Sequence, residues 1–417
     1  YFKLKYNGRF ANHLFASGAY ADGDDCYFIS NNLDSELKNV CARTIYKFNS
    51  QNPAHPNLIY SGLTGSGDYN FELIFAGKTH FGDHMSLAWP TSKPHCGLID
   101  GGTDNPWTAP EVVTNQLSLC GPDNEQLFIS SKLMAYNGYT YFAAYDYSPE
   151  GMSSNQLVRC AFICRTADMQ TFEVKPLLSM RKCSPGSSMK SRIKQISEPD
   201  MTINSDGHCY FVVRAVGDYE STDVSNANKG FYYGEIDDIE DYFTKPDEYP
   251  SWGEELGEPT VWDEYLSQME PERVESLCFK NVQYVDTSAI AGGGHLKGVL
   301  PRIVYNHITQ SPMVVLYGRT PGQEGAYNQL YVRLHPTSGS FIKIGASHKN
   351  SQYISSPQGG NMGVCIWKDS LFIGCPHDRN HDANVFIIPL SAFENEEIAL
   401  SQLPKLEDVE PNAVFEL

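Results

Sequence analysis

The sequence is poor in basic residues and has no long apolar run. Its 31 Lys and Arg stand against 50 Asp and Glu, which gives a formal net charge of −19. Because nucleic-acid binding requires a basic surface, we expect no nucleic-acid partner. A membrane-spanning helix needs a run of roughly 18 or more apolar residues. No such run occurs, so we expect no membrane span.

Short metal and phosphate motifs are also missing. None of the 11 Cys forms a CxxC pair, so a zinc ribbon or knuckle is not expected. No Gly-rich phosphate loop follows a predicted strand, and we predict that no cofactor is required, while a structural Ca²⁺ stays open. A few disulfides also stay open if the protein is exported. Four cysteines in apolar stretches are expected to be small buried hydrophobes, namely Cys160, Cys164, Cys209 and Cys365.

Short apolar segments separated by tight turns dominate the chain instead. Turn centres stand near residues 138, 207, 309 and 369, and the first contains Asn137-Gly138, the strongest short hairpin signal. Four-strand units that recur at about 60–70 residues are typical of propeller blades. We therefore predict an all-β propeller of about six blades, with five or seven as alternatives. The N-terminal strand is expected to join the C-terminal blade and close the ring.

Negative charge is concentrated in one stretch. Residues 218–276 contain 18 Asp and Glu and only 3 Lys and Arg, so they carry −15 of the total −19. We predict that residues 1–417 form a single propeller domain with 218–276 as an acidic insertion. This insertion is either a solvated loop between strands, or a lid or Ca²⁺-binding loop, because carboxylates alone do not distinguish these roles.

The stretch 197–214 carries the clearest chemical signal. Glu198-Pro199 begins a predicted strand, Asp206-Gly207 marks the turn, and the returning strand reaches Arg214. The hairpin therefore brings a carboxylate and a guanidinium to the same end of one blade, near the axis. An acid there serves proton transfer, and an Arg binds an anionic sugar. The alternative is an ordinary structural ion pair.

This segment resembles the central part of bacterial-type sialidases. The resemblance implies a retaining enzyme in which a Glu activates a Tyr nucleophile, an Asp acts as acid/base catalyst, and three Arg residues bind the sialic-acid carboxylate. Glu198 and Arg214 match in order and spacing. The remaining roles fall on Arg319 with Arg302 as its rival, on Arg9, where Arg-Phe-Ala replaces the Arg-Ile-Pro of the family, on Asp34 and on Tyr353.

Residues 166–173 resemble a second group of sugar-cleaving propellers. Thr-Ala-Asp-Met-Gln-Thr-Phe-Glu looks like a shortened Asp-box turn, closer to five-bladed furanosidase-like families. Those families also have a general-acid Glu to which Glu198 is similar, but the N-terminal Asp-Pro that supplies their base is absent. Asp-box turns are structural in either family, so this motif supports the fold rather than a site.

A propeller polysaccharide lyase is a further resemblance. Such an enzyme needs an acid, a base and a cation that neutralises a uronate carboxylate. The residues that would form this site are His80, His84, Tyr145, Arg165 and Arg214. We expect no metal, with His84 and His95 as the alternative ligands.

A propeller with the same Arg-lined centre can also be a lectin or receptor-binding head without catalysis. Our leading interpretation is a sialidase-type glycosidase that takes an acidic oligo- or polysaccharide, with a uronate-specific lyase as the runner-up. The chain begins at Tyr1 without a signal-peptide pattern, which is typical of a mature or trimmed product. For an enzyme of this kind we expect a secreted or periplasmic location.

Overall fold

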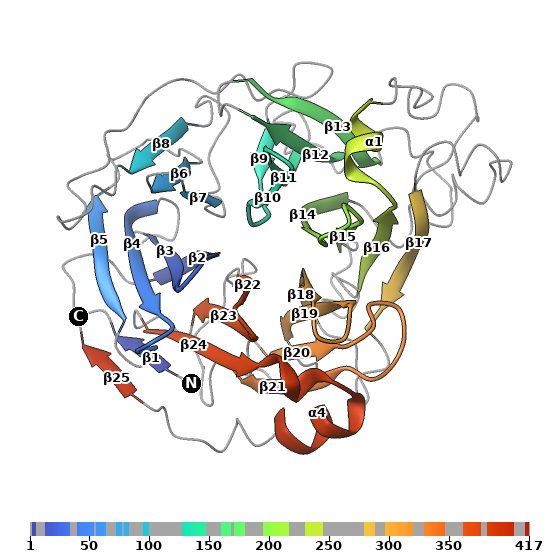
Figure 1. Ribbon diagram of the computed structural model, residues 1–417. Coiled ribbons are helices and arrows are strands. Elements are labelled where there is room, and N and C mark those ends of the chain that lie inside the picture. The colour runs from blue at the N-terminus through green and yellow to red at the C-terminus, as the bar shows by residue number, and fades with distance from the viewer. Residues whose placement is uncertain are drawn as a thin grey trace, which may run out of the picture.

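The computed structural model describes residues 2–5, 13–33, 40–53, 56–63, 72–76, 79–82, 95–99, 127–146, 160–167, 171–179, 195–216, 230–244, 279–287, 297–319, 329–346, 362–376, 382–403 and 413–416. Strands in this part of the chain form six sheets arranged around a ring (Figure 1). Five sheets have four or five strands, and the sixth has three. The predicted all-β propeller is confirmed. The five larger sheets are its blades, so the predicted count of about six is close, and five was one of the alternatives.

The first blade and the small sheet come from the N-terminal part of the chain. The first blade contains β2 (His13–Asp22), β3 (Asp25–Leu33), β4 (Val40–Asn49) and β5 (Asn57–Leu63), paired in that order. The three-stranded sheet contains β6 (Glu72–Ala76), β7 (Thr79–Gly82) and β8 (His95–Ile99).

The three central blades follow the same antiparallel order. One contains β9 (Leu127–Ile129), β10 (Met134–Tyr136), β11 (Tyr139–Asp146), β12 (Cys160–Thr166) and β13 (Glu173–Ser179). The next contains β14 (Gln195–Ile203), β15 (Cys209–Val216), β16 (Gly230–Ile236) and β17 (Phe279–Asp286). The third contains β18 (Lys297–Asn306), β19 (Ser311–Arg319), β20 (Gln329–Arg333) and β21 (Ile342–Ala346).

The last blade joins both ends of the chain. Its strands are β22 (Gly363–Trp367), β23 (Ser370–Pro376), β24 (Asp382–Pro389), β1 (Phe2–Lys5) and β25 (Ala413–Glu416). β1 lies between β24, with which it is antiparallel, and β25, with which it is parallel. The predicted closure of the ring by the N-terminal strand is therefore confirmed, and Figure 1 shows both termini at this blade.

Each turn predicted near the centre of a hairpin is present. Asn137 and Gly138 have φ of 44° and 83° between β10 and β11, as a two-residue hairpin turn requires. Gly207, with φ of 85°, stands between β14 and β15. The other two turns join β18 to β19 and β22 to β23, where Gln310 and Lys368 have positive φ. Local turn chemistry thus sets the register of the inner hairpin in these four blades.

The acidic stretch 218–276 is not an insertion throughout. Within it, β16 (Gly230–Ile236) is the third strand of its blade, and α1 (Ile239–Thr244) follows directly. The strand is apolar and almost fully buried, so the charge count over the whole stretch concealed it. The rest of the predicted insertion lies outside the described residues.

Helices are few in the described ranges: α1, the short 3₁₀ helix η3 (Leu390–Phe393) and α4 (Glu396–Gln402). None of them is long and apolar enough to cross a membrane. The core consists of apolar clusters where neighbouring blades meet. In Figure 1, β2, β14, β18 and β22 lie nearest the centre of the ring, whereas β5, β17 and β21 lie at its outside. These four inner strands therefore surround the axis of the ring.

Candidate functional site

Glu198 has an unusual backbone conformation inside a strand. Its φ is 48°, a left-handed value that costs about 1–3 kcal/mol for a non-Gly residue. The strand pairing explains the position: Ser197 opposes Arg214 and Asp200 opposes Val212, so Glu198 and Pro199 form a bulge opposite a single residue. Pro cannot donate a ladder hydrogen bond and is tolerated at bulges. Bulges commonly redirect a side chain next to a functional site.

The Glu198 carboxylate forms an ion pair with Arg214 on the neighbouring strand. The contact joins Glu198 Oε2 and Arg214 Nη1, and both side chains retain some exposure, 11% and 18%. The predicted meeting of these two residues is confirmed. A carboxylate that is shielded but reachable by solvent is suited to proton transfer, and an adjacent guanidinium is suited to binding an anion.

The bulge is anchored by the neighbouring blade. Ser130 donates its hydroxyl hydrogen bond to the Pro199 carbonyl over 2.6 Å, and this contact is buried. The next residue, Ser131, accepts a hydrogen bond from the Ala143 amide over 2.6 Å, which fixes the segment between β9 and β10. The Pro199 carbonyl, directly after Glu198, is therefore held by Ser130 of the neighbouring blade.

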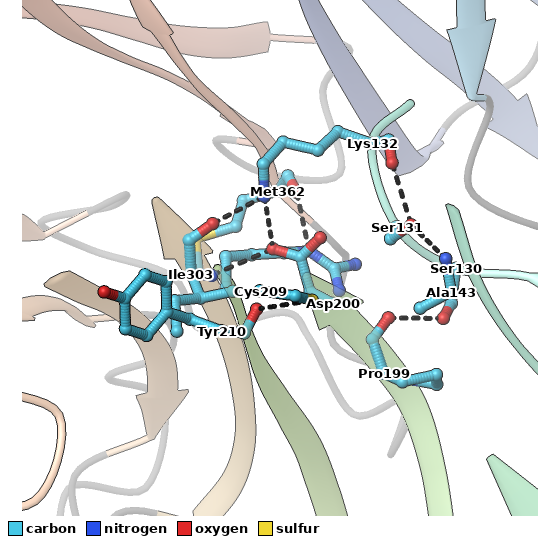
Figure 2. Close-up of polar contacts among 11 residues, drawn as sticks. Ser130, Ser131, Lys132, Ala143, Pro199, Asp200, Cys209, Tyr210, Ile303 and Met362 are labelled. Carbon is cyan, nitrogen blue, oxygen red and sulfur yellow. Dashed lines mark hydrogen bonds and ion pairs between the residues drawn. The ribbon is translucent and has the colours of Figure 1, made fainter. Parts of the chain in front are cut away.

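Asp200 joins three blades through one carboxylate oxygen. Its Oδ2 accepts hydrogen bonds from Lys132 Nζ over 3.0 Å and from the Ile303 amide over 2.8 Å. Lys132 also donates to the Ile303 carbonyl. Figure 2 shows the Asp200 carboxylate between these two partners. Asp200 is fully buried, and burial lowers the pKa of Lys132, although the adjacent carboxylate opposes that shift.

Arg302 lies in the same region, and few hydrogen bonds satisfy its buried guanidinium group. It is 3% exposed, its Nε donates to the Met362 carbonyl over 3.3 Å, and its buried Nη1 has no hydrogen-bond partner among the described residues. Burial lowers the pKa of Arg302, the carboxylates of Asp200 and Glu198 raise it, and Arg214 lowers it further. Arg302 therefore interacts electrostatically with Glu198, Asp200 and Arg214.

Tyr145 is the last residue of this region. It is buried on β11 and interacts electrostatically with Arg302. We call the six residues Lys132, Tyr145, Glu198, Asp200, Arg214 and Arg302 the Glu198 cluster. Three cations and two carboxylates leave this cluster with a formal charge of +1, within a chain whose net charge is −19. A buried group of this sign favours an anionic ligand.

The structure does not bring Arg165, one of the predicted substrate-binding residues, to this cluster. Its Nε and Nη2 form a bidentate pair with Glu173 over 2.9 Å each. Its guanidinium carbon lies 4.4 Å from the ring centroids of Tyr139 and Phe243. In the ladder Arg165 pairs with Tyr141, close to the Asn137-Gly138 turn, whereas Arg214 stands at the opposite end of its hairpin. Arg165 is therefore part of the blade's own packing.

Three other predicted residues are placed by their strands alone. Arg319 is the last residue of β19 and pairs with Lys297 at the start of β18, so it lies at the same end of its hairpin as Arg214 does. His80 lies in β7 and His95 begins β8. Asp34, Arg9, Tyr353 and His84 lie outside the described residues. In the described ranges, no group of His, Cys, Asp and Glu is arranged to hold a metal.

Sequence reasoning missed Lys132 and Asp200. Asp200 stands two residues after Glu198, and its acidic side chain directly before Met201 within a predicted strand was the available signal. Lys132 gave no such signal, because its partner is 68 residues away on another blade.

No family model and no curated protein matches the sequence. Solved structures are similar in fold. An α-L-arabinofuranosidase from Fusarium graminearum, bound to an iminosugar inhibitor, has 11% identity and a TM-score of 0.50, with 94% of this chain and 99% of that chain covered. An α-L-arabinanase from Penicillium chrysogenum has 11% identity, a TM-score of 0.47 and coverage of 91% and 94%.

A sialidase from Trypanosoma rangeli, captured as a covalent intermediate with difluorosialic acid, has 8% identity and a TM-score of 0.46. The comparison covers 94% of this chain but only 55% of that sialidase, so the chain spans about half of its length. At such identities the likeness concerns the fold alone. The chain therefore has a β-propeller fold, which it shares with the arabinofuranosidase, and the propeller expected from the sequence is confirmed.

Proposed function

We propose that the protein is a glycoside hydrolase that cleaves acidic glycans as a retaining exo-glycosidase of sialidase type. One observation carries the proposal: Glu198 has a strained backbone in a strand bulge, its 11% exposed carboxylate is paired with Arg214, and it interacts electrostatically with the buried Arg302. Strain of this kind persists only where surrounding structure holds it, and it is concentrated at functional sites.

In this proposal Glu198 takes the proton of a Tyr nucleophile. Tyr353 is the candidate for that nucleophile, and Asp34 is the candidate acid/base; both assignments come from the sequence resemblance. A neutral phenol approaches an anionic anomeric centre with less repulsion than a carboxylate does, and a Glu beside it increases its nucleophilicity.

The two guanidinium groups would bind the substrate carboxylate. Arg forks fit a planar carboxylate in bidentate geometry. The electrostatic interaction of Arg302 with both Glu198 and Arg214 supports it as one of these ligands. Arg9 and Arg319 remain candidates for further contacts, and the net positive charge of the Glu198 cluster supports an acidic rather than a neutral glycan.

The lyase alternative rests on Tyr145. This phenol lies close enough to Arg302 to interact with it electrostatically, so an acid or base and a uronate-neutralising cation occur together. In that reaction the base removes the proton α to the uronate carboxylate, and the glycosidic oxygen leaves from the β position. His80 and His84 would supply the second proton-transfer group. For either enzyme we propose a secreted or periplasmic location, where polysaccharide substrates are found, and a structural Ca²⁺ stays a sequence-based expectation.

The test is to incubate the protein with an α-sialoside, a uronate-containing polysaccharide and an arabino-oligosaccharide. Released sugar and the ultraviolet absorbance of an unsaturated uronate are followed together. We expect sialic acid without the absorbance change, and a loss of at least about 100-fold in kcat for Glu198→Gln, which removes proton transfer. Glu173→Gln is the matched control, because Glu173 pairs with Arg165 at the other end of a blade.

Each other outcome overturns this assignment in a defined way. A rise in absorbance would replace the hydrolase with the lyase. Arabinose release alone would show a neutral furanosidase, and the role of the two Arg residues as carboxylate ligands would be wrong. Glycan binding without any product would show a lectin, and equal activity of Glu198→Gln and Glu173→Gln would remove Glu198 from catalysis.

A further inference from the structure

Two cysteines face each other where the first and last blades meet. Cys26 lies on β3 and Cys365 on β22, and their Sγ atoms are 3.7 Å apart although the residues are 339 positions apart in sequence. Both side chains are buried, with exposures of 0% and 6%. The sequence prediction of a small buried hydrophobe is correct for Cys365, but it gave no indication of a sulfur partner.

The surrounding packing holds both sulfurs in place. The apolar cluster at this junction contains Ala19, Cys26, Phe28, Tyr46, Phe48, Cys365, Trp367, Phe372 and Val385. Phe372 of the last blade packs edge-on against Phe48 of the first, with ring centroids 5.3 Å apart. Lys368 and Asp24 form an ion pair over 2.9 Å across the same junction. Since side chains of both blades interlock around them, the two thiols stay neighbours in the folded protein.

This junction is where the ring is closed. β1 connects the two ends of the chain by hydrogen bonds alone, through its pairing with β24 and β25. If β1 separates from β24, only side-chain contacts between the first and last blades still join the N-terminal and C-terminal parts of the chain at this point. A covalent bond between residue 26 and residue 365 would prevent that opening, because it joins the same two parts independently of β1.

We propose that Cys26 and Cys365 form a disulfide that covalently closes the propeller ring. An S–S bond of about 2.05 Å requires the two sulfurs to move closer than they are as thiols, which side-chain rotation of two adjacent cysteines can supply. In the structure all four cysteines with described side chains are buried free thiols, and Cys164 and Cys209 differ from Cys26 and Cys365 because no described sulfur contacts them.

The reaction is a thiol–disulfide exchange with a small disulfide oxidant. One thiolate attacks the oxidant and forms a mixed disulfide, which releases one thiol. The second thiolate then attacks the protein sulfur of that mixed disulfide and releases the other thiol. Two thiol protons and two electrons pass to the oxidant. Burial raises the pKa of the Cys26 thiol well above its usual value, so we expect exchange during folding, before this junction closes.

Stabilisation follows from the length of the closed loop. A cross-link constrains the unfolded chain more strongly as the loop becomes longer, and typical native disulfides contribute about 2–4 kcal/mol. For a large domain, roughly 2 °C in Tm corresponds to each kcal/mol, so we expect an increase of about 4–8 °C over the reduced protein.

The experiment refolds the full chain in a mixture of reduced and oxidised glutathione. Remaining thiols are blocked, the protein is digested, and linked peptides are identified by mass spectrometry. We expect a peptide pair joined through Cys26 and Cys365, and a Tm difference between oxidised and reduced protein that disappears in Cys365→Ala. The matched control Cys164→Ala, another buried free thiol, should retain that difference.

Recovery of Cys26 and Cys365 only as separately blocked peptides would overturn the proposal. So would a Tm difference that survives in Cys365→Ala, because other cysteines would then be responsible. The mass spectrum of the unmodified protein decides the question even if a variant fails to fold. Formation of this disulfide is independent of the proposed glycosidase activity, since neither cysteine belongs to the Glu198 cluster.

Discussion

The buried ion pair between Lys132 and Asp200 should be a major determinant of stability. Lys132→Met removes the ammonium group and retains most of the apolar stem. Asp200 then keeps only the Ile303 amide as a hydrogen-bond donor to its Oδ2. Its side chain is 1% exposed, so water cannot replace the missing ammonium.

The expected magnitude follows from the burial of both partners. Removing one partner of a buried ion pair costs about 3–5 kcal/mol, because the other charge remains without compensation. We expect a value near 3 kcal/mol, at the lower end of that range, since the nearby Arg302 still attracts the carboxylate. Total stabilities are about 5–15 kcal/mol, so this single change would remove a large fraction.

The assay is equilibrium unfolding in urea, followed by fluorescence and circular dichroism. The matched control is Lys47→Met in a partly exposed pair with Asp25, at 2.7 Å and with side-chain exposures of 34% and 24%. That change should cost no more than about 1 kcal/mol. The double variant Lys132→Met/Asp200→Leu removes both charges. It should be more stable than Lys132→Met alone, although the Ile303 amide then lacks its acceptor.

Two results would refute this reasoning. If Lys132→Met and Lys47→Met lower the free energy of unfolding by the same amount, burial does not control the pair. If the double variant loses as much free energy of unfolding as Lys132→Met and Asp200→Leu lose together when each is measured alone, the two charges do not interact.

Two further predictions concern packing and pH. A Cβ on Gly374 would clash with the Phe28 ring, so Gly374→Ala should cost about 1–3 kcal/mol, and an unchanged Tm would contradict the packing of the first blade on the last. Burial raises the pKa of Glu235, but hydrogen bonds from His208 and Asn281 outweigh it, and the pKa is lowered. This carboxylate stabilises the fold above its unfolded pKa near 4.5 and loses that effect as pH falls through the lower folded value. The Tm of Glu235→Gln should therefore lie below wild type at neutral pH and converge with it in acid; a constant difference would exclude this titration.

The fold could be predicted because its signals are local. A two-residue turn such as Asn137-Gly138 sets the register of its hairpin, whatever the rest of the chain does. The repetition of such hairpins then indicates blades. The closing strand β1 was predictable for a different reason, since a propeller without it would leave a free edge.

The charge count was misleading where it combined a buried strand with acidic residues on either side. The stretch 218–276 is strongly acidic as a whole, yet Gly230-Phe231-Tyr232-Tyr233 within it is apolar and buried. A reading of the local pattern identifies this strand, whereas the charge count hides it. Neither a local pattern nor the composition indicates the contact between Cys26 and Cys365, because two strands far apart in sequence meet where the ring closes.

The bulge at Glu198 shows why the site could be predicted only in part. Spacing across the hairpin was enough to bring Glu198 to Arg214, but it gave no hint that Glu198 adopts a left-handed conformation. The bonds that hold this conformation come from other blades: Ser130 holds the carbonyl of Pro199, and Lys132 with the Ile303 amide holds Asp200. They fix the two residues directly after Glu198, so the strand cannot relax into regular pairing without breaking them. The contacts that join these three blades are therefore also the contacts that orient the candidate catalytic carboxylate. A substitution that weakens them should change the conformation of Glu198 before it unfolds the ring.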